Sequence, residues 1–447
     1  MKSARPPSTV PGSQDDRARR TAFEVLRALR RGLAWEAAWE RQAKRLASGS
    51  LDRRFAQELA SGATRLRGRL DHVLTQHLDR PTAALDRDVL DLLRLGAYQL
   101  LETEVAEHSA VHATVELSKR VCPRATTLVN AVLRAVQRER RTLQFPDRSA
   151  APLEQLVTYG SHPEWIVRRW LQRFGASETG ALCDYDNRRP QLCLRPNPGR
   201  ATQEEILAAL PGSVVGRWAA SSMRCSATGY AAVRALVEAG KASVQDESAT
   251  LVVEEAAPAP GEAWLDLAAA PGGKAGHLAE RVGEGGRVLA FDTTAAKVGR
   301  LRANAERLGL PQLVAAVGEA RSLRLPPADG VLLDAPCSGL GVLARRPDAR
   351  WRKQPGDPAR LAALQAELLE AAAVHVRPGG LLVYSVCSFE PEETEAVASA
   401  FSAQHPEFAL ESGPAAPELR SGSGILYLLP QRHGVDGGFV ARWRRAP

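Results

Sequence analysis

The fold of this 447-residue chain is decided by the stretch Gly330-Val331-Leu332-Leu333-Asp334-Ala335-Pro336-Cys337-Ser338-Gly339. It begins with an apolar run of the length of a buried strand. Polarity returns at Asp334, and Pro336 and Gly339 then stop both the strand and an immediate helix. An acid and a thiol are therefore held on a stiff loop at the carboxyl end of a strand, where open α/β sheets bind ligands. A strand end with a helix-capping Asp and an incidental Cys would show the same pattern. Other stretches of the sequence are therefore needed to distinguish a functional site from such a strand end.

Outward from this stretch, strands alternate with helices from Ser243 to the end of the chain, which is typical of a doubly wound parallel sheet. We expect strands over residues 263–267, 287–291, 313–317, 330–333 and 380–385, and helices over residues 294–308 and 358–376. Residues 425–429 and 439–443 are expected to form a closing antiparallel pair.

A second strand also ends at a thiol, in Leu382-Val383-Tyr384-Ser385-Val386-Cys387-Ser388-Phe389-Glu390-Pro391-Glu392-Glu393. A lone Cys is more often a small buried hydrophobe. Two strand ends of one parallel sheet, however, place Cys337 and Cys387 at the same edge. The sequence therefore predicts a site with two thiols.

The first strand runs into the small-residue turn Asp266-Leu267-Ala268-Ala269-Ala270-Pro271-Gly272-Gly273-Lys274. A phosphate-binding P-loop would need Gly at 268 and a hydroxyl at 275, and both are Ala. The Gly-x-Gly-x-x-Gly pattern is also missing, which weakens a nicotinamide cofactor. A turn of this kind suits S-adenosylmethionine, and Asp292 at the end of the next strand could accept both ribose hydroxyls, although it could instead cap a helix.

Two thiols beside a methyl donor suit methylation at C5 of a pyrimidine. That carbon is a poor nucleophile until a thiolate adds to C6. The C5 proton must leave before the thiolate is expelled, so a second thiol is useful as base or helper. An acid near N3, here Asp334, would stabilise the adduct. The base must be unpaired or flipped out, which requires a grip on the surrounding RNA.

The first third of the chain is basic and helical. Residues 1–150 hold 27 Lys and Arg against 18 Asp and Glu, although the whole chain carries only +8. A solvated helical surface would account for this excess as well as a polyanion-binding face would. Several turns resemble the NusB-like RNA-binding fold: Leu51-Asp52-Arg53-Arg54-Phe55, Gly62 with Leu70-Asp71, Leu92-Leu93-Arg94-Leu95-Gly96-Ala97-Tyr98-Gln99-Leu100 and Leu128-Val129-Asn130-Ala131-Val132-Leu133-Arg134.

The chain is thus expected to be multidomain. Residues 1–15 are predicted to be a disordered tail, and residues 16–145 an all-α NusB-like bundle that binds RNA. After a Pro/Arg-bearing linker, residues 153–240 mix a helix over 165–174 with short strands, which indicates a small α+β subdomain, RRM-like by resemblance. Residues 241–447 form the α/β Rossmann-like domain.

The catalytic strings resemble the RNA 5-methylcytosine methyltransferases. Residues 334–341, followed by Arg345-Arg346-Pro347-Asp348 and Trp351, look like their motif IV. Residues 384–388 look like motif VI and residues 266–274 like motif I, and residues 245–248 and 430–439 also match. With the NusB-like front, nearly the whole chain is similar to the Sun/Fmu branch of the RsmB/NOP family of class I methyltransferases.

This resemblance implies Cys387 as the nucleophile and Cys337 as the group that assists elimination and product release. It also implies that Asp334 meets the cytosine and that Lys274 lies near the target base. The implied S-adenosylmethionine site comprises Ala268, Ala269, Ala270, Pro271, Gly272, Gly273, Lys274, Asp292, Glu319 and Asp334. No metal site is implied.

The chain departs from the family pattern at four places. Ala268 replaces a Cys, Val386 replaces the usual Thr before the nucleophile, and Gly438 replaces an aromatic residue. Glu319 stands where the family has Asp, so the acceptor for the adenine amine is one methylene longer. We expect slightly altered cofactor affinity and retained activity.

The resulting hypothesis is an enzyme that methylates 16S rRNA, as naked or early pre-subunit RNA, and acts as a monomer. The same chemistry on tRNA or 23S rRNA, or a non-catalytic RNA-binding assembly factor, remains an alternative. Six Cys without a CxxC pair suit a reduced cytoplasm, and no apolar run reaches the roughly 18 residues of a membrane span.

Overall fold

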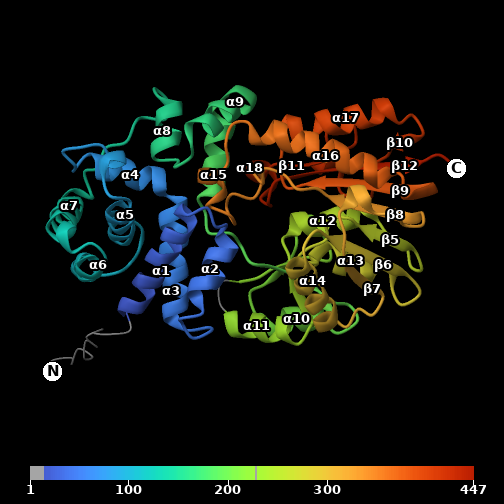
Figure 1. The fold of residues 1–447 in the computed structure, drawn as a ribbon, viewed down its shortest axis with the longest axis horizontal. Coiled ribbons are helices and arrows are strands. Elements are labelled where there is room, and N and C mark those ends of the chain that lie inside the picture. The colour runs from blue at the N-terminus through green and yellow to red at the C-terminus, as the bar shows by residue number, and fades with distance from the viewer. Residues whose placement is uncertain (1–14, 227–228) are drawn as a thin grey trace. The chain divides into compact units, whose positions relative to one another are not determined.

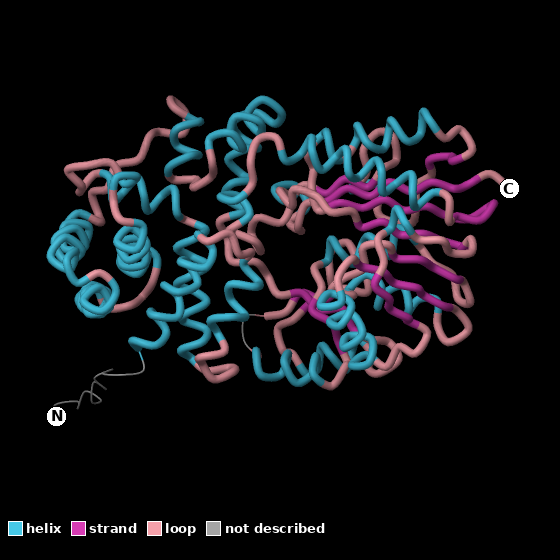
Figure 2. Tube along the Cα trace, in the orientation of Figure 1, coloured by secondary structure: helices cyan, strands magenta, loops and turns pink. Residues whose placement is uncertain are grey.

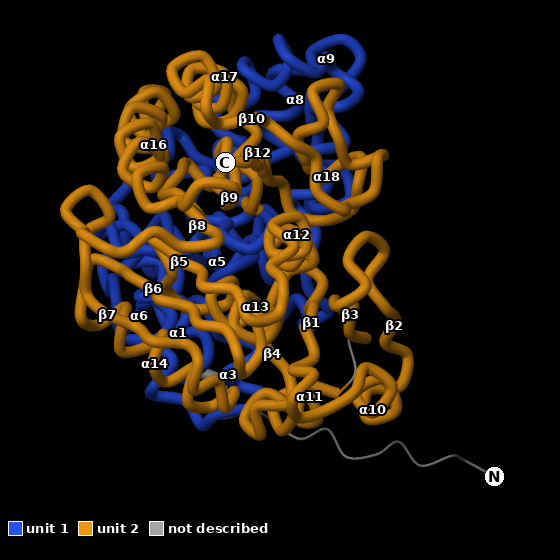
Figure 3. Tube along the Cα trace, turned by 90° about the vertical axis from the view of Figure 1, so that its right-hand side faces the viewer, with its two compact units in different colours: residues 1–188, 344–352 blue, residues 189–343, 353–447 orange. Residues whose placement is uncertain are grey.

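The computed structural model describes residues 15–226 and 229–447, which form two compact units (Figures 1 and 3). Unit 1 comprises residues 1–188 and 344–352, and unit 2 comprises residues 189–343 and 353–447. The tail predicted over residues 1–15 lies outside the described residues except for Asp15, where the first helix begins. Among the helices of the described ranges, none combines the length and apolar character that a membrane crossing needs.

Unit 1 is helical, as predicted for the NusB-like bundle. Its helices are α1 (Asp15–Arg30), α2 (Trp35–Ala43), α3 (Leu51–Arg65), α4 (Arg67–Thr75), α5 (Arg87–Glu102), α6 (Glu107–Val121), α7 (Thr126–Glu139), α8 (Pro152–Thr158), α9 (Glu164–Asp186) and α15 (Ala349–Arg352). Ser50 caps α3 by accepting the Arg53 backbone N–H, and Asp86 caps α5. The apolar faces of α1 to α7 form one core around residues such as Leu59, Leu70, Leu92 and Leu133, which are fully buried.

Two glycines let the helices of this bundle approach closely. A Cβ on Gly62 of α3 would lie 1.9 Å from Cζ of Tyr98 on α5. A Cβ on Gly96 of α5 would lie 2.5 Å from Cδ1 of Leu133 on α7. Both glycines belong to the NusB-like strings of the sequence, so those strings encode close helix packing.

Residues 344–352 follow a strand of the large sheet in the sequence but pack within unit 1. Arg350 is fully buried and donates to the carbonyls of Ser161 and Asp186 and to Oδ1 of Asn187, at 2.8–3.1 Å. The helix predicted over residues 165–174 is part of α9 and groups with unit 1, since Arg350 binds the C-terminal end of α9. The strands of the small subdomain therefore begin beyond residue 188.

The small subdomain is α+β, as predicted. Its antiparallel sheet has the order β2-β3-β1-β4, with strands β1 (Cys193–Pro196), β2 (Val214–Val215), β3 (Met223–Arg224) and β4 (Ala242–Val244). Helices α10 (Gln203–Ala209) and α11 (Tyr230–Glu238) share a core with Leu194 and Met223. Arg195 of β1 is 1% exposed and pairs with Glu280 in the α/β Rossmann-like domain. The face of the small sheet that carries Arg195 is therefore covered.

The large sheet has the order β10-β12-β9-β8-β5-β6-β7; its strands are labelled in Figure 1 and are magenta in Figure 2. Strands β5 (Ala263–Asp266), β6 (Arg287–Asp292), β7 (Leu313–Val317), β8 (Ala328–Asp334) and β9 (Val376–Val386) are parallel, as predicted. The predicted closing pair is β11 (Leu426–Leu428) with β12 (Gly438–Arg445), and β12 also pairs with β9 and with β10 (Phe408–Leu410).

Helices pack against this sheet: α12 (Glu247–Ala256), α13 (Gly273–Val282), α14 (Ala295–Leu308), α16 (Asp357–Ala373) and α17 (Glu395–Gln404); the short α18 (Pro430–His433) connects β11 to β12. Helix α16 ends three residues before the predicted end because β9 begins at Val376. Strand order reverses between β5 and β8, so the ligand crevice of such a sheet lies at the carboxyl ends of these strands.

Candidate active site

The two thiols predicted at the sheet edge lie next to each other. Cys337 follows β8 and Cys387 follows β9, and these strands are paired in parallel with Asp334 opposite Ser385. The Sγ atoms of Cys337 and Cys387 are 3.2 Å apart, and both side chains are half-buried. A single substrate atom could therefore be approached by both sulfurs.

Asp334 and Lys274 form an ion pair at the same edge. Lys274 stands in the first turn of α13, and its Nζ lies 2.7 Å from Oδ2 of Asp334. The second carboxylate oxygen of Asp334 accepts the Ser385 hydroxyl at 2.9 Å. Burial lowers the pKa of Lys274, but the attraction of Asp334, followed by that of Cys387, outweighs it and the pKa is raised. The ammonium is thus held charged beside the thiols.

The charges around the two sulfurs differ. The pKa of Cys337 is raised well above its usual value by its hydrogen bond with Cys387, by burial, and by the carboxylates of Glu393 and Asp334. The ammonium of Lys274, in contrast, interacts favourably with a negative Cys387. These charges favour the thiol form of Cys337.

Several polar residues around the thiols had no role in the sequence-based prediction. Ser385 orients Asp334, and Glu393 accepts hydrogen bonds from Ser338 and Ser388, the residues that directly follow the two cysteines. The paired glutamates after Pro391 were visible in the sequence. Only the fold, however, shows that Glu393 is buried and bonded to the loops after β8 and after β9.

The small-residue turn between β5 and α13 is held by backbone hydrogen bonds to the next strand. The Ala269 N–H donates to the Phe291 carbonyl at 2.9 Å, and the Ala270 N–H donates to Oδ2 of Asp292 at 3.2 Å. Gly272 has a φ of 108°, which a side chain would strain, and α13 begins at the next residue. Residues 268–274 thus bring backbone to the crevice without bulky side chains.

The residues around this turn fit S-adenosylmethionine, which carries a positive sulfonium. Burial and the charges of Asp334 and Asp292 raise the pKa of Asp266 to about 7. Oδ2 of Asp266 is buried without a hydrogen-bond partner among the described residues. Three carboxylates, those of Asp266, Asp292 and Asp334, lie around the turn. Among the described residues, lysine contacts are made to two of them, by Lys297 and by Lys274, so that the remaining negative charge favours a cationic ligand.

The two predicted acceptors for the cofactor's nucleoside are placed differently. Asp292 ends β6 and already accepts from Lys297 Nζ at 2.8 Å and from the Thr293 N–H at 2.7 Å. Glu319 lies just beyond β7, half-exposed, and pairs with Nε of Arg321 at 3.0 Å. Both carboxylates lie at the carboxyl ends of neighbouring strands, and each is already paired with a cation of its own loop or helix.

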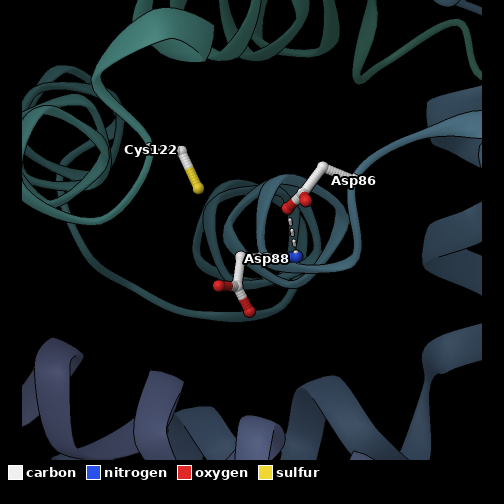
Figure 4. Close-up of side chains that lie close together, drawn as sticks. All are labelled: Asp86, Asp88 and Cys122. Carbon is white, nitrogen blue, oxygen red and sulfur yellow. Dashed lines mark hydrogen bonds between the residues drawn. The ribbon is translucent and has the colours of Figure 1, made fainter.

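Three possible metal ligands lie close together in unit 1: Asp86, Asp88 and Cys122 (Figure 4). The interactions of the two carboxylates explain their position without a metal ion. Asp86 caps α5, and Asp88 forms ion pairs with Arg27 and Arg30. Burial and the two carboxylates raise the pKa of the Cys122 thiol, which disfavours the thiolate that metals bind. Helix capping and ion pairing account for these side chains.

Three parts of the chain match known protein families. Residues 16–138 match the NusB family, residues 162–216 match the ferredoxin-like domain of the Methyltr_RsmF/B-like group, and residues 254–444 match the 16S rRNA methyltransferase RsmB/F family. The Ribosomal RNA small subunit methyltransferase B of Pseudomonas putida is 36% identical over 88% of this chain and 90% of its own length.

Two solved structures are similar as well. The crystal structure of PH0851 has a TM-score of 0.81 and 26% identity, and it covers 98% of this chain and 99% of its own. NSun6 from Pyrococcus horikoshii, crystallised with SFG, has a TM-score of 0.57 and 19% identity over 64% of this chain and 98% of its own, which shows the fold alone.

Proposed function

Because the chain belongs to the 16S rRNA methyltransferase RsmB/F family, we propose that it methylates C5 of one cytosine in 16S rRNA, at a cytosine 967-type site. Its cofactor is S-adenosylmethionine. The observation that carries the proposal is the 3.2 Å approach of the Cys337 and Cys387 sulfurs, beside the ion pair of Lys274 and Asp334. One methylated base needs one thiol to form a bond and another group to help break it.

In this mechanism Cys387 is the nucleophile. Its thiolate, stabilised by the Lys274 ammonium, forms a bond to C6 of the cytosine, and the electron pair of the C5–C6 double bond moves toward C5. Asp334 meets the cytosine ring, where a carboxyl group near N3 stabilises the adduct. S-adenosylmethionine supplies an electrophilic methyl group when it is bound at residues 268–274, Asp292, Glu319 and Asp334.

Cys337 acts in the second half of the reaction. The nearby carboxylates keep it protonated at the start, so it does not compete with Cys387 for C6. A base, here a water molecule, takes the C5 proton, the electron pair of the C5–H bond re-forms the C5–C6 double bond, and the Cys387 sulfur leaves as a thiolate that the Cys337 thiol can stabilise by its hydrogen bond. We assign to Cys337 the help in this elimination and release.

The helical unit provides the RNA-contacting module in this proposal, since a basic helical surface suits a polyanion. The substrate would be naked or early pre-subunit 16S rRNA, bound by a monomer in the cytoplasm, where ribosomes are assembled. The same residues would serve tRNA or 23S rRNA equally well, because only the NusB-like part favours 16S rRNA.

The test is methyl transfer by the purified chain to 16S rRNA, 23S rRNA and tRNA, followed by bisulfite sequencing. We expect one C5-methylated cytosine in 16S rRNA. Cys387→Ala should abolish transfer, and Cys337→Ala should accumulate a covalent protein–RNA adduct, seen as a slow band on a denaturing gel. Normal transfer by Cys387→Ala would refute the mechanism, and transfer only to tRNA or 23S rRNA would refute the substrate. A chain that fails to bind S-adenosylmethionine in calorimetry would instead be a non-catalytic RNA-binding factor.

A further inference from the structure

We infer that Glu393 is a positioning residue that joins the loop after β8 to the loop after β9 and places its charge next to them. The inference rests on the proposed function and assigns a role to a residue that does not touch the substrate. Glu393 ends the short helix η4 (Pro391–Glu393) and is fully buried.

The carboxylate of Glu393 is bound by four donors, three of them on the catalytic loops. Oε1 accepts the Ser338 N–H at 2.6 Å and Nε2 of Gln365 at 3.2 Å. Oε2 accepts the hydroxyls of Ser338 at 2.5 Å and Ser388 at 2.6 Å. Since Ser338 follows Cys337 and Ser388 follows Cys387, one carboxylate holds the residue after each sulfur.

The same anchor is tied to a helix and to a strand. Gln365 of α16 also donates to the Pro336 carbonyl at 2.9 Å, one residue before Cys337. The Tyr384 hydroxyl contacts the Glu393 carbonyl oxygen at 2.6 Å and Oε1 of Gln365 at 2.9 Å. The loops after β8 and β9 are thereby fixed to each other and to rigid elements. Such support keeps two reacting groups at a constant separation.

The charge of Glu393 also acts on the Cys337 thiol. The pKa of Cys337 is raised by its hydrogen bond with Cys387 and by burial, and the carboxylates of Glu393 and Asp334 add to the rise. Glu393 therefore places negative charge near the thiol whose loop it holds.

The decisive variant is Glu393→Gln in the full chain, which keeps the size and removes the charge. Iodoacetamide alkylation of Cys337, followed by peptide mass spectrometry across pH, measures its titration without any RNA. We expect the midpoint to fall, so that alkylation of Cys337 at pH 8 is several-fold faster than in the wild type. Glu418→Gln, at an exposed position, is the matched control and should behave like the wild type.

Methyl transfer gives the second readout. In Glu393→Gln the kcat should fall by about 10-fold to 100-fold, while KM for S-adenosylmethionine stays unchanged, because the loops shift and the cofactor turn does not. Ser338→Ala and Ser388→Ala each remove one anchor but keep the charge. They should lower kcat without moving the titration of Cys337.

An unchanged Cys337 titration in folded Glu393→Gln would overturn the inference. So would a shift of equal size in Ser338→Ala. If Glu393→Gln does not fold, the two serine variants decide, and wild-type kcat in both overturns the positioning role. If the wild-type chain methylates no RNA, the proposed function fails on its own, while the titration still tests whether Glu393 controls Cys337.

Discussion

Replacing Arg350 with methionine tests how residues 344–352 are held in unit 1. The Arg350 guanidinium is fully buried and makes three hydrogen bonds of 2.8–3.1 Å, to Ser161, Asp186 and Asn187, and a longer one of 3.4 Å. Burial lowers its pKa to about 10, so it is charged at neutral pH. Methionine fills similar space but offers no donor.

The magnitude follows from two opposing effects. Three hydrogen bonds from a charged group contribute about 1.5 kcal/mol each at the low end, or about 5 kcal/mol together. Relief of the buried charge subtracts from this sum, and removal of one member of a buried ionic network typically costs about 3–5 kcal/mol. We therefore expect Arg350→Met to lower the free energy of unfolding of unit 1 by about 3 kcal/mol.

Urea unfolding followed by far-UV circular dichroism measures this loss, because unit 1 is almost entirely helical. With a slope of about 2 kcal/mol per molar, its transition should move down by about 1.5 M. Arg352→Met is the control in the same segment, since Arg352 is 40% exposed and pairs only with Asp348, which predicts a loss below about 1 kcal/mol. Equal shifts in the two variants would refute the assigned role of Arg350.

Three further predictions concern packing, pH and oxidation. In thermal unfolding, Gly62→Ala should destabilise the chain by more than about 2 kcal/mol, because the added Cβ meets the buried ring of Tyr98. Gly299→Ala should instead stabilise it by about 1 kcal/mol, because the added Cβ lies on an exposed part of α14 with nothing within 4 Å. Burial raises the pKa of Asp186 to about 7, so the folded state binds an extra proton above the usual carboxyl pKa, and stability is lost as the pH rises toward 7. Asp186→Asn should therefore gain about 1.4 kcal/mol per pH unit relative to the wild type between pH 4 and 7, and parallel stability curves would contradict this. Oxidised glutathione should join Cys337 to Cys387 with loss of methyl transfer, restored by dithiothreitol; a mass spectrum showing only glutathione adducts on separate sulfurs would speak against their 3.2 Å approach.

Local sequence was sufficient for most of the architecture. Apolar runs closed by polar residues, Pro or Gly predicted the five parallel strands and the closing antiparallel pair, because strand length and termination depend on neighbouring residues. Helical periodicity in the first third predicted the bundle for the same reason. The predictions were least precise at the ends of elements, because α16 ends at Ala373 and β9 begins at Val376.

By itself, the sequence determined that Asp334, Cys337 and Cys387 lie at or just after the ends of two strands, because a strand end and the residues that follow it are neighbours in the chain. Only the tertiary structure decided that the two sulfurs meet at 3.2 Å, because this depends on the pairing of β8 with β9 across about fifty residues of chain. It also decided that Glu393 binds both catalytic loops. A hydrogen bond between distant segments leaves no periodic trace in the sequence, because its partners are brought together only by the packing of the elements that carry them.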